Sequence, residues 1–192
     1  MKNILIIGCG LLGSSLLRKI SKNKIAKKIF IYEKSRSHIL LIKKLKLKGT
    51  IVNKLEDGIK QSDLIILCTP MSSYKKIILK MNNFLKPDHI ITDVGSAKKE
   101  SFKIINKFLK KNISWISSHP ITGSEVSGPR YGRHDLFENK WCILTKDENT
   151  NKNHLLKLKI FWKSIGSKTV EMDAEKHDKI FSITSHLPHL IA

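Results

Sequence analysis

The chain has 192 residues, of which 27% are charged and 41% hydrophobic, and its 36 Lys and Arg against 16 Asp and Glu give a formal net charge of +20. This length is ample for a hydrophobic core, and apolar residues recur throughout in blocks the length of strands and helices, which excludes a disordered chain despite the charge. No apolar run approaches the roughly 18 residues that a membrane-spanning helix requires, so a soluble, cytoplasmic protein without membrane partners is expected.

The first part of the chain alternates between strand-like and helix-like segments. Asn3–Ile7 predicts a strand, Leu11–Ser21 has helical spacing, and Lys28–Glu33 predicts a second strand that ends in a carboxylate. His38–Leu47 then predicts a helix that Gly49 would end, since glycine commonly terminates helices. The chain therefore opens with a β-α-β unit.

The same alternation continues through the middle of the chain. The predicted elements are the strands Leu64–Cys68, His89–Thr92 and Trp115–Ser118 and the helices Ser72–Leu85 and Lys98–Lys111. Ser72 or Ser73 is expected to cap the first of these helices. Strands that are apolar on both faces and alternate with helices are typical of a parallel sheet covered on both sides. The sequence therefore predicts a doubly wound α/β fold.

The last third of the chain begins with a segment that has no regular pattern. Ile121–Lys140 predicts a loop of about twenty residues, longer than ordinary connections and therefore favouring a functional role. Trp141–Thr145 and Lys168–Met172 predict strands on either side of a helix near Asn153–Ile165. Ala174–Ala192 then predicts a long helix without a terminating signal, so we expect a longer protein to continue it.

The cysteines do not indicate a disulfide framework or a metal site. Cys9, Cys68 and Cys142 are odd in number, far apart, and not part of a C-x-x-C pair, so buried free thiols in a reducing compartment are expected. The start of the chain has the outline of a lipoprotein signal, but only the four apolar residues Ile4–Ile7 precede Gly8-Cys9. A secretory signal needs an apolar core of about 7–15 residues, so this interpretation is rejected.

The high positive charge raises the question of nucleic-acid binding. Only four of the 36 basic residues are arginines, and the lysines are scattered over every predicted helix. Specific nucleic-acid readers rely on arginine for bidentate contacts and on aromatic residues for stacking, and neither signature is present. Solvated lysine-rich surfaces are favoured, with a field that attracts small anionic ligands as the alternative.

A glycine-rich motif connects the first strand to the first helix. Gly8-Cys9-Gly10-Leu11-Leu12-Gly13 has the spacing G-x-G-x-x-G in the strand-to-helix context that gives this pattern its meaning. Gly8 would permit a tight turn, Gly10 would let a pyrophosphate approach the backbone, and Gly13 would allow close packing of helix on strand. The helix N-terminus would add free N–H groups and a positive dipole end. Dinucleotide binding is therefore predicted here.

An acidic residue indicates which dinucleotide would bind. Glu33 lies twenty residues after Gly13, at the end of the second strand, where a carboxylate would accept hydrogen bonds from ribose hydroxyls. NAD is favoured over NADP because a carboxylate would repel a 2′-phosphate. Lys34, Ser35 and Arg36 keep NADP open as the alternative, since they could hold such a phosphate if Glu33 turned away.

The other candidate residues follow the carboxyl ends of later strands, where open α/β sheets bind their ligands. Thr69 and Pro70 fit either a turn or the lining of the cofactor site. Ser96 fits either a functional role or the cap of the helix that begins near Ala97, and these two roles are compatible. His119 follows two serines and opens the long loop where a nicotinamide should lie, which favours a catalytic role.

These motifs together resemble the prephenate/arogenate dehydrogenase family of tyrosine biosynthesis. The resemblance rests on the glycine motif and on three further segments, and it runs through nearly the whole chain in the order and spacing of the family. The three segments are Asp93-Val94-Gly95-Ser96-Ala97-Lys98, His119-Pro120-Ile121-Thr122-Gly123-Ser124-Glu125 with Ser127-Gly128, and Ser185-His186-Leu187-Pro188-His189.

The resemblance implies two domains. Residues 1–172 would form a Rossmann-type dinucleotide-binding domain, and residues 173–192 would be the first helix of a helical domain through which the family forms homodimers. The sequence departs from the family pattern by ending there. The rest of that domain, and an arginine that the family uses to bind a substrate carboxylate, are expected in a longer protein.

The resemblance also implies roles for individual residues. His119 would accept a hydrogen bond from the C4 hydroxyl of prephenate while hydride leaves C4 for the nicotinamide, and Ser96 would orient that hydroxyl or the imidazole. His189, and with less support His186, would face the substrate from the helical domain. The loop that would close one side of the pocket contains Thr122, Gly123, Ser124 and Glu125.

Three functions remain open at this point. The first is an NAD-dependent dehydrogenase acting on prephenate or on arogenate, since nothing in the sequence decides between a keto and an amino side chain. The second is a truncated module that binds NAD without turnover. The third is a basic protein that binds anions or nucleic acid on the same scaffold. No metal is expected in any of them.

Overall fold

The structure is a computed structural model that describes residues 1–146 and 150–182. Its main sheet within this part of the chain has six strands, all parallel, in the order β3-β2-β1-β4-β5-β6. The strands are β1 (Asn3–Ile7), β2 (Lys28–Tyr32), β3 (Thr50–Ile51), β4 (Leu64–Leu67), β5 (Ile90–Asp93) and β6 (Ser114–Trp115). The predicted doubly wound α/β fold is confirmed.

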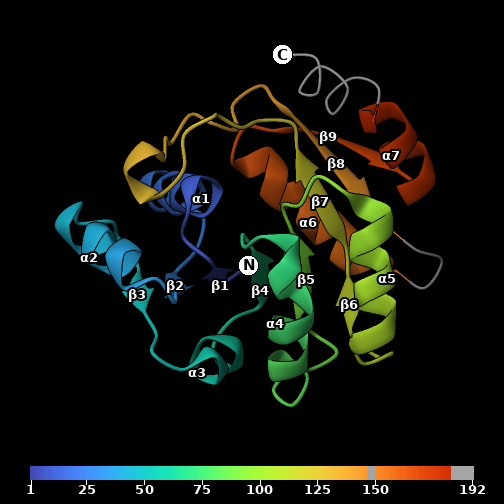
Figure 1. Cartoon of the computed structure of the whole chain (residues 1–192), viewed down its shortest axis with the longest axis horizontal. Helices are drawn as coiled ribbons and strands as arrows, with labels where there is room; N and C mark the ends of the chain where they lie inside the picture. Colours follow the sequence, from blue (N-terminus) through green and yellow to red (C-terminus); the bar gives the residue numbers. More distant parts are fainter. Residues whose placement is uncertain (147–149, 183–192) are drawn as a thin grey trace.

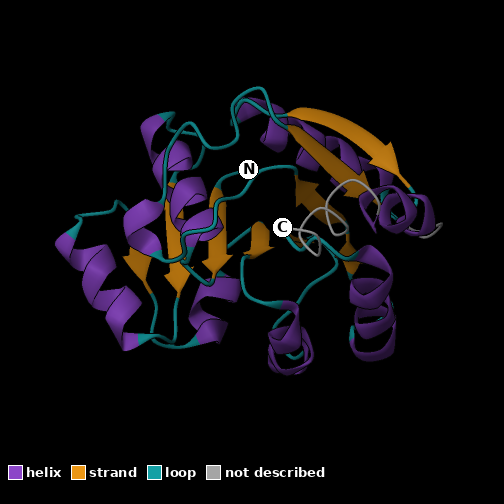
Figure 2. Ribbon diagram, turned by 45° about the horizontal axis from the view of Figure 1, so that its top comes forward, coloured by secondary structure: helices purple, strands orange, loops and turns teal. Residues whose placement is uncertain are grey.

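Helices cover both faces of this sheet (Figures 1 and 2). They are α1 (Leu11–Lys22), α2 (Arg36–Lys44), α3 (Leu55–Lys60), α4 (Tyr74–Met81), α5 (Lys98–Phe108), α6 (Lys152–Ser164) and α7 (Ala174–Phe181), with short 3-10 turns η1 (Met71–Ser73) and η2 (Pro129–Tyr131). Alternate residues of β1 enter different cores because strand side chains alternate between faces. Ile4 and Ile6 pack in a core with α1 and α6, whereas Leu5 and Ile7 pack with α3, α4 and α5.

A second sheet follows the first. It consists of β7 (Ser117–Pro120), β8 (Trp141–Thr145) and β9 (Lys168–Met172), with β7 antiparallel to β8 and β8 parallel to β9. The prediction of one strand over 115–118 is therefore wrong. The backbone N–H of Ile116 still donates to Ile91 O beside the main sheet, while Ser117 already pairs with Thr145. Apolar patterning identifies buried strands but does not identify their partners, so this transfer could not be predicted.

Several predicted helix signals differ from the structure. Helix α2 ends at Lys44, and the chain turns at Lys46, which has a left-handed backbone conformation (φ 50°). Gly49 therefore does not end the helix. It lies in a tightly packed place, where a Cβ would be 2.8 Å from Ile31 and 3.0 Å from Leu17. Ser72 and Ser73 belong to η1, and Ser73 makes no side-chain capping bond to α4. The short elements β3 and α3 lie below the length that sequence periodicity detects.

Helix α7 begins the segment predicted over 174–192. The Asp173 carboxylate caps it by accepting from the backbone N–H of Lys176 at 2.7 Å. The remainder of the predicted helix, from residue 183, lies outside the described residues. Among the residues that the structure describes, we find no helix with both the length and the low polarity needed to cross a bilayer.

Candidate active site

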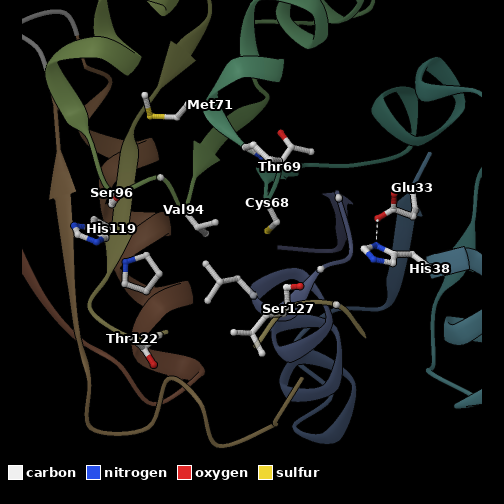
Figure 3. Close-up of a pocket in the computed structure, with 18 of the residues that line it drawn as sticks. Glu33, His38, Cys68, Thr69, Met71, Val94, Ser96, His119, Thr122 and Ser127 are labelled. Carbon is white, nitrogen blue, oxygen red and sulfur yellow. Dashed lines mark ion pairs between the residues drawn. The ribbon is translucent and has the colours of Figure 1, made fainter. Parts of the chain in front are cut away.

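A cavity of about 760 Å³ lies at the carboxyl ends of the parallel strands. It is lined at one end by the glycine turn, Glu33 and His38, and at the other by Ser96 and His119 (Figure 3). Thr69 and Pro70, which follow β4, also line it. Carboxyl strand ends meet at one edge of a parallel sheet, so residues far apart in sequence converge on one pocket.

Each glycine of the turn meets a different steric demand. Gly8 has a φ of +87°, and a Cβ there would lie 2.7 Å from Thr69 Cγ2. A Cβ on Gly13 would lie 2.1 Å from Gly8 O, so the first turn of α1 packs directly on the strand end. Among the described residues, no atom beyond its own chain neighbours lies within 4 Å of the Cβ position of Gly10, which lines the cavity. This open space at a helix N-terminus suits a pyrophosphate group.

Glu33 is held by backbone donors. Its Oε2 accepts from the N–H of Cys9 at 2.7 Å, and its Oε1 accepts from Lys34 and Ser35 at 2.7 and 2.8 Å. His38 Nδ1 lies 3.5 Å from Glu33 Oε2, the contact drawn as a dashed line in Figure 3. These bonds fix the carboxylate at the rim of the cavity. His38 was not predicted, because a lone histidine in an amphipathic helix carries no sequence signal.

A buried ion pair supports the opposite end of the cavity. Lys98 Nζ and the Asp93 carboxylate are fully buried and 3.3 Å apart. Lys98 also donates to Ser117 Oγ at 2.9 Å and to Ser118 O at 2.7 Å, and Tyr74 donates its hydroxyl to Asp93 Oδ2 at 3.0 Å. Burial lowers the pKa of Lys98, although Asp93 opposes this shift, and burial beside Asp93 raises the pKa of Tyr74 well above its usual range. The network joins β5 to β7.

Ser96 lines the cavity but does not cap α5, so that part of its prediction is wrong. The N-cap residue is Ala97, whose side chain offers no acceptor. The backbone N–H groups of Lys98 and Lys99, which the first turn of α5 leaves without a carbonyl partner within the helix, instead donate to the carboxylate of Asp178, at 2.9 and 2.8 Å. The cap therefore comes from α7, eighty residues along the chain from Lys98.

The long loop reaches the cavity at two places. Thr122 lines it and donates its hydroxyl to Leu136 O at 3.0 Å. Ser127 and Gly128 also line it, although they were not predicted as site residues. The other predicted loop residues do not line the cavity and are exposed to solvent; they are Gly123, Ser124 and Glu125.

Two contacts hold this loop against α1. Arg18 Nη2 donates to Pro129 O at 3.1 Å, and the Arg133 backbone N–H donates to Ser15 Oγ at 3.0 Å. A Cβ on Gly132 would lie 2.1 Å from Ser14 Oγ, so the chain passes close to the helix here. These contacts anchor the loop on α1, the helix that follows the glycine turn. Ser127 and Gly128, which precede the anchored residues, line the same cavity as that turn.

A histidine that sequence reasoning missed contacts His119. His177 Nε2 lies 2.8 Å from His119 Nδ1, and the His177 side chain is fully buried. His177 stands 58 residues from His119, in a helix without a recognisable motif. The one available signal was its acidic neighbour Asp178, since an imidazole beside a carboxylate is a common arrangement at active sites. The predicted His186 and His189 lie outside the described residues.

The cysteines are free, as predicted. Burial raises the pKa of Cys9 to about 12, with the Glu33 charge adding to the effect, so this thiol beside the glycine turn is protonated at neutral pH. Burial also raises the pKa values of Cys68 and Cys142. In the described ranges, no three His, Cys, Asp or Glu side chains gather in a way that could hold a metal ion.

Comparison with known proteins gives consistent matches over nearly the whole chain. A family profile described as "Prephenate dehydrogenase, nucleotide-binding domain" matches residues 16–171. Cyclohexadienyl dehydrogenase of Zymomonas mobilis is 35% identical over 191 residues, which cover 100% of this chain and 65% of that protein. Prephenate dehydrogenase of Bacillus subtilis is 30% identical over 190 residues, which cover 98% of this chain and 51% of that protein.

A solved structure matches the fold closely. The crystal structure of prephenate dehydrogenase from A. aeolicus in complex with hydroxyphenyl propionate and NAD+ superimposes with a TM-score of 0.91 at 30% identity. The match covers 100% of this chain and 66% of that one. The chain thus spans between about half and two thirds of the length of these three relatives.

Proposed function

Because this chain belongs to the prephenate dehydrogenase family, we propose that it acts in the NAD-dependent oxidative decarboxylation of prephenate to 4-hydroxyphenylpyruvate. One observation carries this proposal: the glycine turn and His119 line opposite ends of one cavity (Figure 3). A dinucleotide laid along the cavity, with its pyrophosphate at Gly10, would bring its nicotinamide toward His119.

The residues present fit NAD. The open space at Gly10 accommodates a pyrophosphate, and the N-terminus of α1 offers N–H groups and a positive dipole end. The Glu33 carboxylate at the rim would accept from the ribose hydroxyls and repel a 2′-phosphate, which favours NAD over NADP. Leu11, Leu12, Thr69 and Pro70 also line the cavity. When bound, NAD supplies a nicotinamide ring that accepts hydride.

The chemistry asked of the protein is modest. Prephenate loses a hydride from C4 and carbon dioxide from C1, and aromatisation of the ring drives both steps. The protein must align C4 and withdraw charge from the C4 hydroxyl. His119 would do this by accepting a hydrogen bond from that hydroxyl, and Ser96, which lines the same end of the cavity, would orient it.

The substrate is a small dianion, and the net charge of +20 would draw it toward the protein. Of the four predicted loop residues, Thr122 is the one that lines the cavity and is therefore best placed to contact the substrate. Gly123, Ser124 and Glu125 would do so only if the loop moved inward. His186 and His189 remain proposed substrate contacts. Arogenate is the alternative substrate, and a homodimer is the proposed assembly.

The proposal is tested by cofactor titration and turnover with His119→Asn. The variant should bind NAD as tightly as the parent, because His119 lies at the far end of the cavity from the glycine turn. Turnover of prephenate should fall by about 10²–10⁴, the usual contribution of a positioned acid–base group. His134→Asn is a matched control, because His134 is an exposed histidine of the same loop.

The outcomes separate the candidate functions. Turnover of arogenate in preference to prephenate would reassign the substrate. NAD binding without turnover of either compound would leave a binding module, and the absence of NAD binding would contradict the proposal outright. Near-normal turnover by His119→Asn would remove His119 from the mechanism.

A further inference from the structure

A chain of hydrogen bonds leads from His119 to the N-terminus of α5. His119 Nδ1 and His177 Nε2 are 2.8 Å apart, and His177 Nδ1 lies 2.7 Å from Asp178 Oδ1. The Phe181 ring stacks on His177 and meets His119 edge-on, with centroid distances of 4.6 and 5.1 Å. The two imidazoles are therefore held both by hydrogen bonding and by packing.

Asp178 is the fixed end of this chain. Its carboxylate accepts from the backbone N–H groups of Lys98 and Lys99, the first residues of α5. Burial raises the pKa of this carboxyl, but these two bonds and the contact with His177 outweigh the effect, so the pKa lies below its usual range. Asp178 is therefore ionised at neutral pH and can only accept hydrogen bonds.

The ionised Asp178 carboxylate determines which atom is the donor in each of these hydrogen bonds. Since the Asp178 carboxylate only accepts, His177 must carry its hydrogen on Nδ1. Burial lowers the pKa of His177, with Asp178 and Asp93 opposing and Lys98 assisting, so the ring is neutral and its Nε2 is an acceptor. The hydrogen in the bond between the two imidazoles then belongs to His119 Nδ1. A neutral His119 in this state has its lone pair on Nε2.

We propose that His177 and Asp178 are positioning residues that hold His119 in the Nδ1–H tautomer, with Nε2 as the atom that accepts the substrate hydroxyl. The identity of the substrate in this proposal rests on the proposed function. The tautomer of His119 does not, because it is set by contacts within the protein. As Nε2 accepts the hydroxyl hydrogen bond and charge develops on the ring, the bond from Nδ1–H to His177 strengthens. No proton is transferred between His119, His177 and Asp178, and none is gained or lost by these residues overall.

The tautomer can be measured without turnover. Long-range ¹H–¹⁵N correlation spectra of the chain labelled with ¹⁵N-histidine report which ring nitrogen carries hydrogen, and His119→Asn identifies the His119 signals. His119 should show the Nδ1–H form. In His177→Leu this preference should be lost. In His177→Gln, where an amide oxygen can take the place of Nε2, it should be kept. A parent spectrum with hydrogen on Nε2 overturns the proposal.

The kinetic measurement adds a second, independent test. His177→Leu should lower kcat for prephenate by about 10-fold to 100-fold, a part of the effect of a positioned acid–base group, with the KM for NAD unchanged. His177→Gln should recover most of the loss. Glu175→Gln is the matched control, because Glu175 also pairs with α5, through Lys99 at 3.6 Å, while its side chain is 83% exposed.

The two proposals fail in different ways. A folded parent chain that turns over neither prephenate nor arogenate contradicts the proposed function, while its spectrum still decides the tautomer. Wild-type kcat in His177→Leu, or equal loss in the Leu and Gln variants at equal unfolding midpoints, contradicts the role of His177. If His177→Leu does not fold, the parent spectrum and the Gln variant decide the matter.

Discussion

At the scale of single residues, the glycines of the turn have different roles: Gly10 leaves space for a ligand, whereas Gly8 and Gly13 allow the protein to pack. Gly10 faces open space in the cavity, whereas the Cβ positions of Gly8 and Gly13 are occupied by other atoms of the protein. A side chain at Gly10 would therefore compete with a ligand, and a side chain at Gly13 would compete with the backbone. Two substitutions in one six-residue motif should consequently fail for different reasons.

Gly10→Val is expected to weaken NAD binding at least about tenfold, because the new methyl groups would occupy the space where a pyrophosphate approaches the backbone. Its unfolding midpoint should stay close to that of the parent. Gly13→Val should instead lower the midpoint, since its Cβ would lie 2.1 Å from Gly8 O. Calorimetric titration and thermal unfolding measure the two effects. Parent-like NAD affinity in Gly10→Val would show that the pyrophosphate lies elsewhere.

Glu33→Ser should shift the preference from NAD toward NADP. The substitution removes a carboxylate that would repel a 2′-phosphate, and it frees the N–H groups of Lys34 and Ser35, which now donate to Glu33. The side chains of Lys34 and Arg36 are close enough in sequence to add positive charge. Dissociation constants for both cofactors, measured in parent and variant, give the ratio. An unchanged ratio would count against Glu33 as the ribose ligand.

The candidate residues whose place in the cavity follows most directly from the sequence are those attached to strand ends. Gly8, Thr69 and Ser96 reach one cavity because parallel strands place their carboxyl ends along one edge, a rule that needs no structure. His177 could not be found in this way. It reaches His119 only through the packing of α7 on α5, a contact between helices whose relative position no local pattern encodes.

At the scale of elements, Lys98 and Asp93 explain how the two sheets are joined. Asp93 ends β5, Lys98 begins α5, and both bind serines of β7. In the sequence they read as polar residues around a turn, and the pattern gave no sign that both charges are buried. The main sheet was predictable from the alternation of strands and helices. The transfer of the chain to the second sheet at Ile116 was not predictable, because the contacts of Lys98 and Asp93, rather than local periodicity, hold β7 in its place.

Lys98→Met should destabilise the protein by about 3–5 kcal/mol, because it leaves the Asp93 carboxylate buried without its cation. Chemical denaturation of the parent and the variant gives this difference in the free energy of unfolding. The double variant with Asp93→Asn should recover part of the loss. Lys103→Met is the control, since Lys103 lies exposed on the same helix and pairs with the exposed Glu100. Equal stability of the parent and Lys98→Met would show that the buried pair contributes nothing.

At the scale of the whole molecule, buried histidines link stability to pH. Burial lowers the pKa values of His89, His154 and His177 below the ordinary 6.5. In the unfolded chain these rings take up protons near pH 6.5, whereas in the folded chain they do so only at lower pH. Stability should therefore be complete above pH 6.5 and fall as the pH drops through the lower folded-state values.

Denaturation midpoints measured from neutral pH downward test this expectation. The decline should begin at a higher pH than that caused by carboxylates, whose ordinary pKa values are 3.8 and 4.5. Replacing His154 by Gln should flatten the curve between neutral pH and pH 6, while His134→Gln, an exposed position, should leave its shape unchanged. A midpoint that stays constant down to the carboxylate range would contradict the expectation.

The strand order also bears on how the site emerges during synthesis. Of the six described strands of the main sheet, β1 comes first along the chain and lies between β2 and β4, and each of the other five pairs with a strand that precedes it. β7 differs, because its partner β8 leaves the ribosome some twenty residues later. A nascent chain can therefore complete the glycine turn and Glu33 early, while the His119 end waits for residues 141–145. We expect the adenosine half of the cavity to be competent before the half that would carry out chemistry.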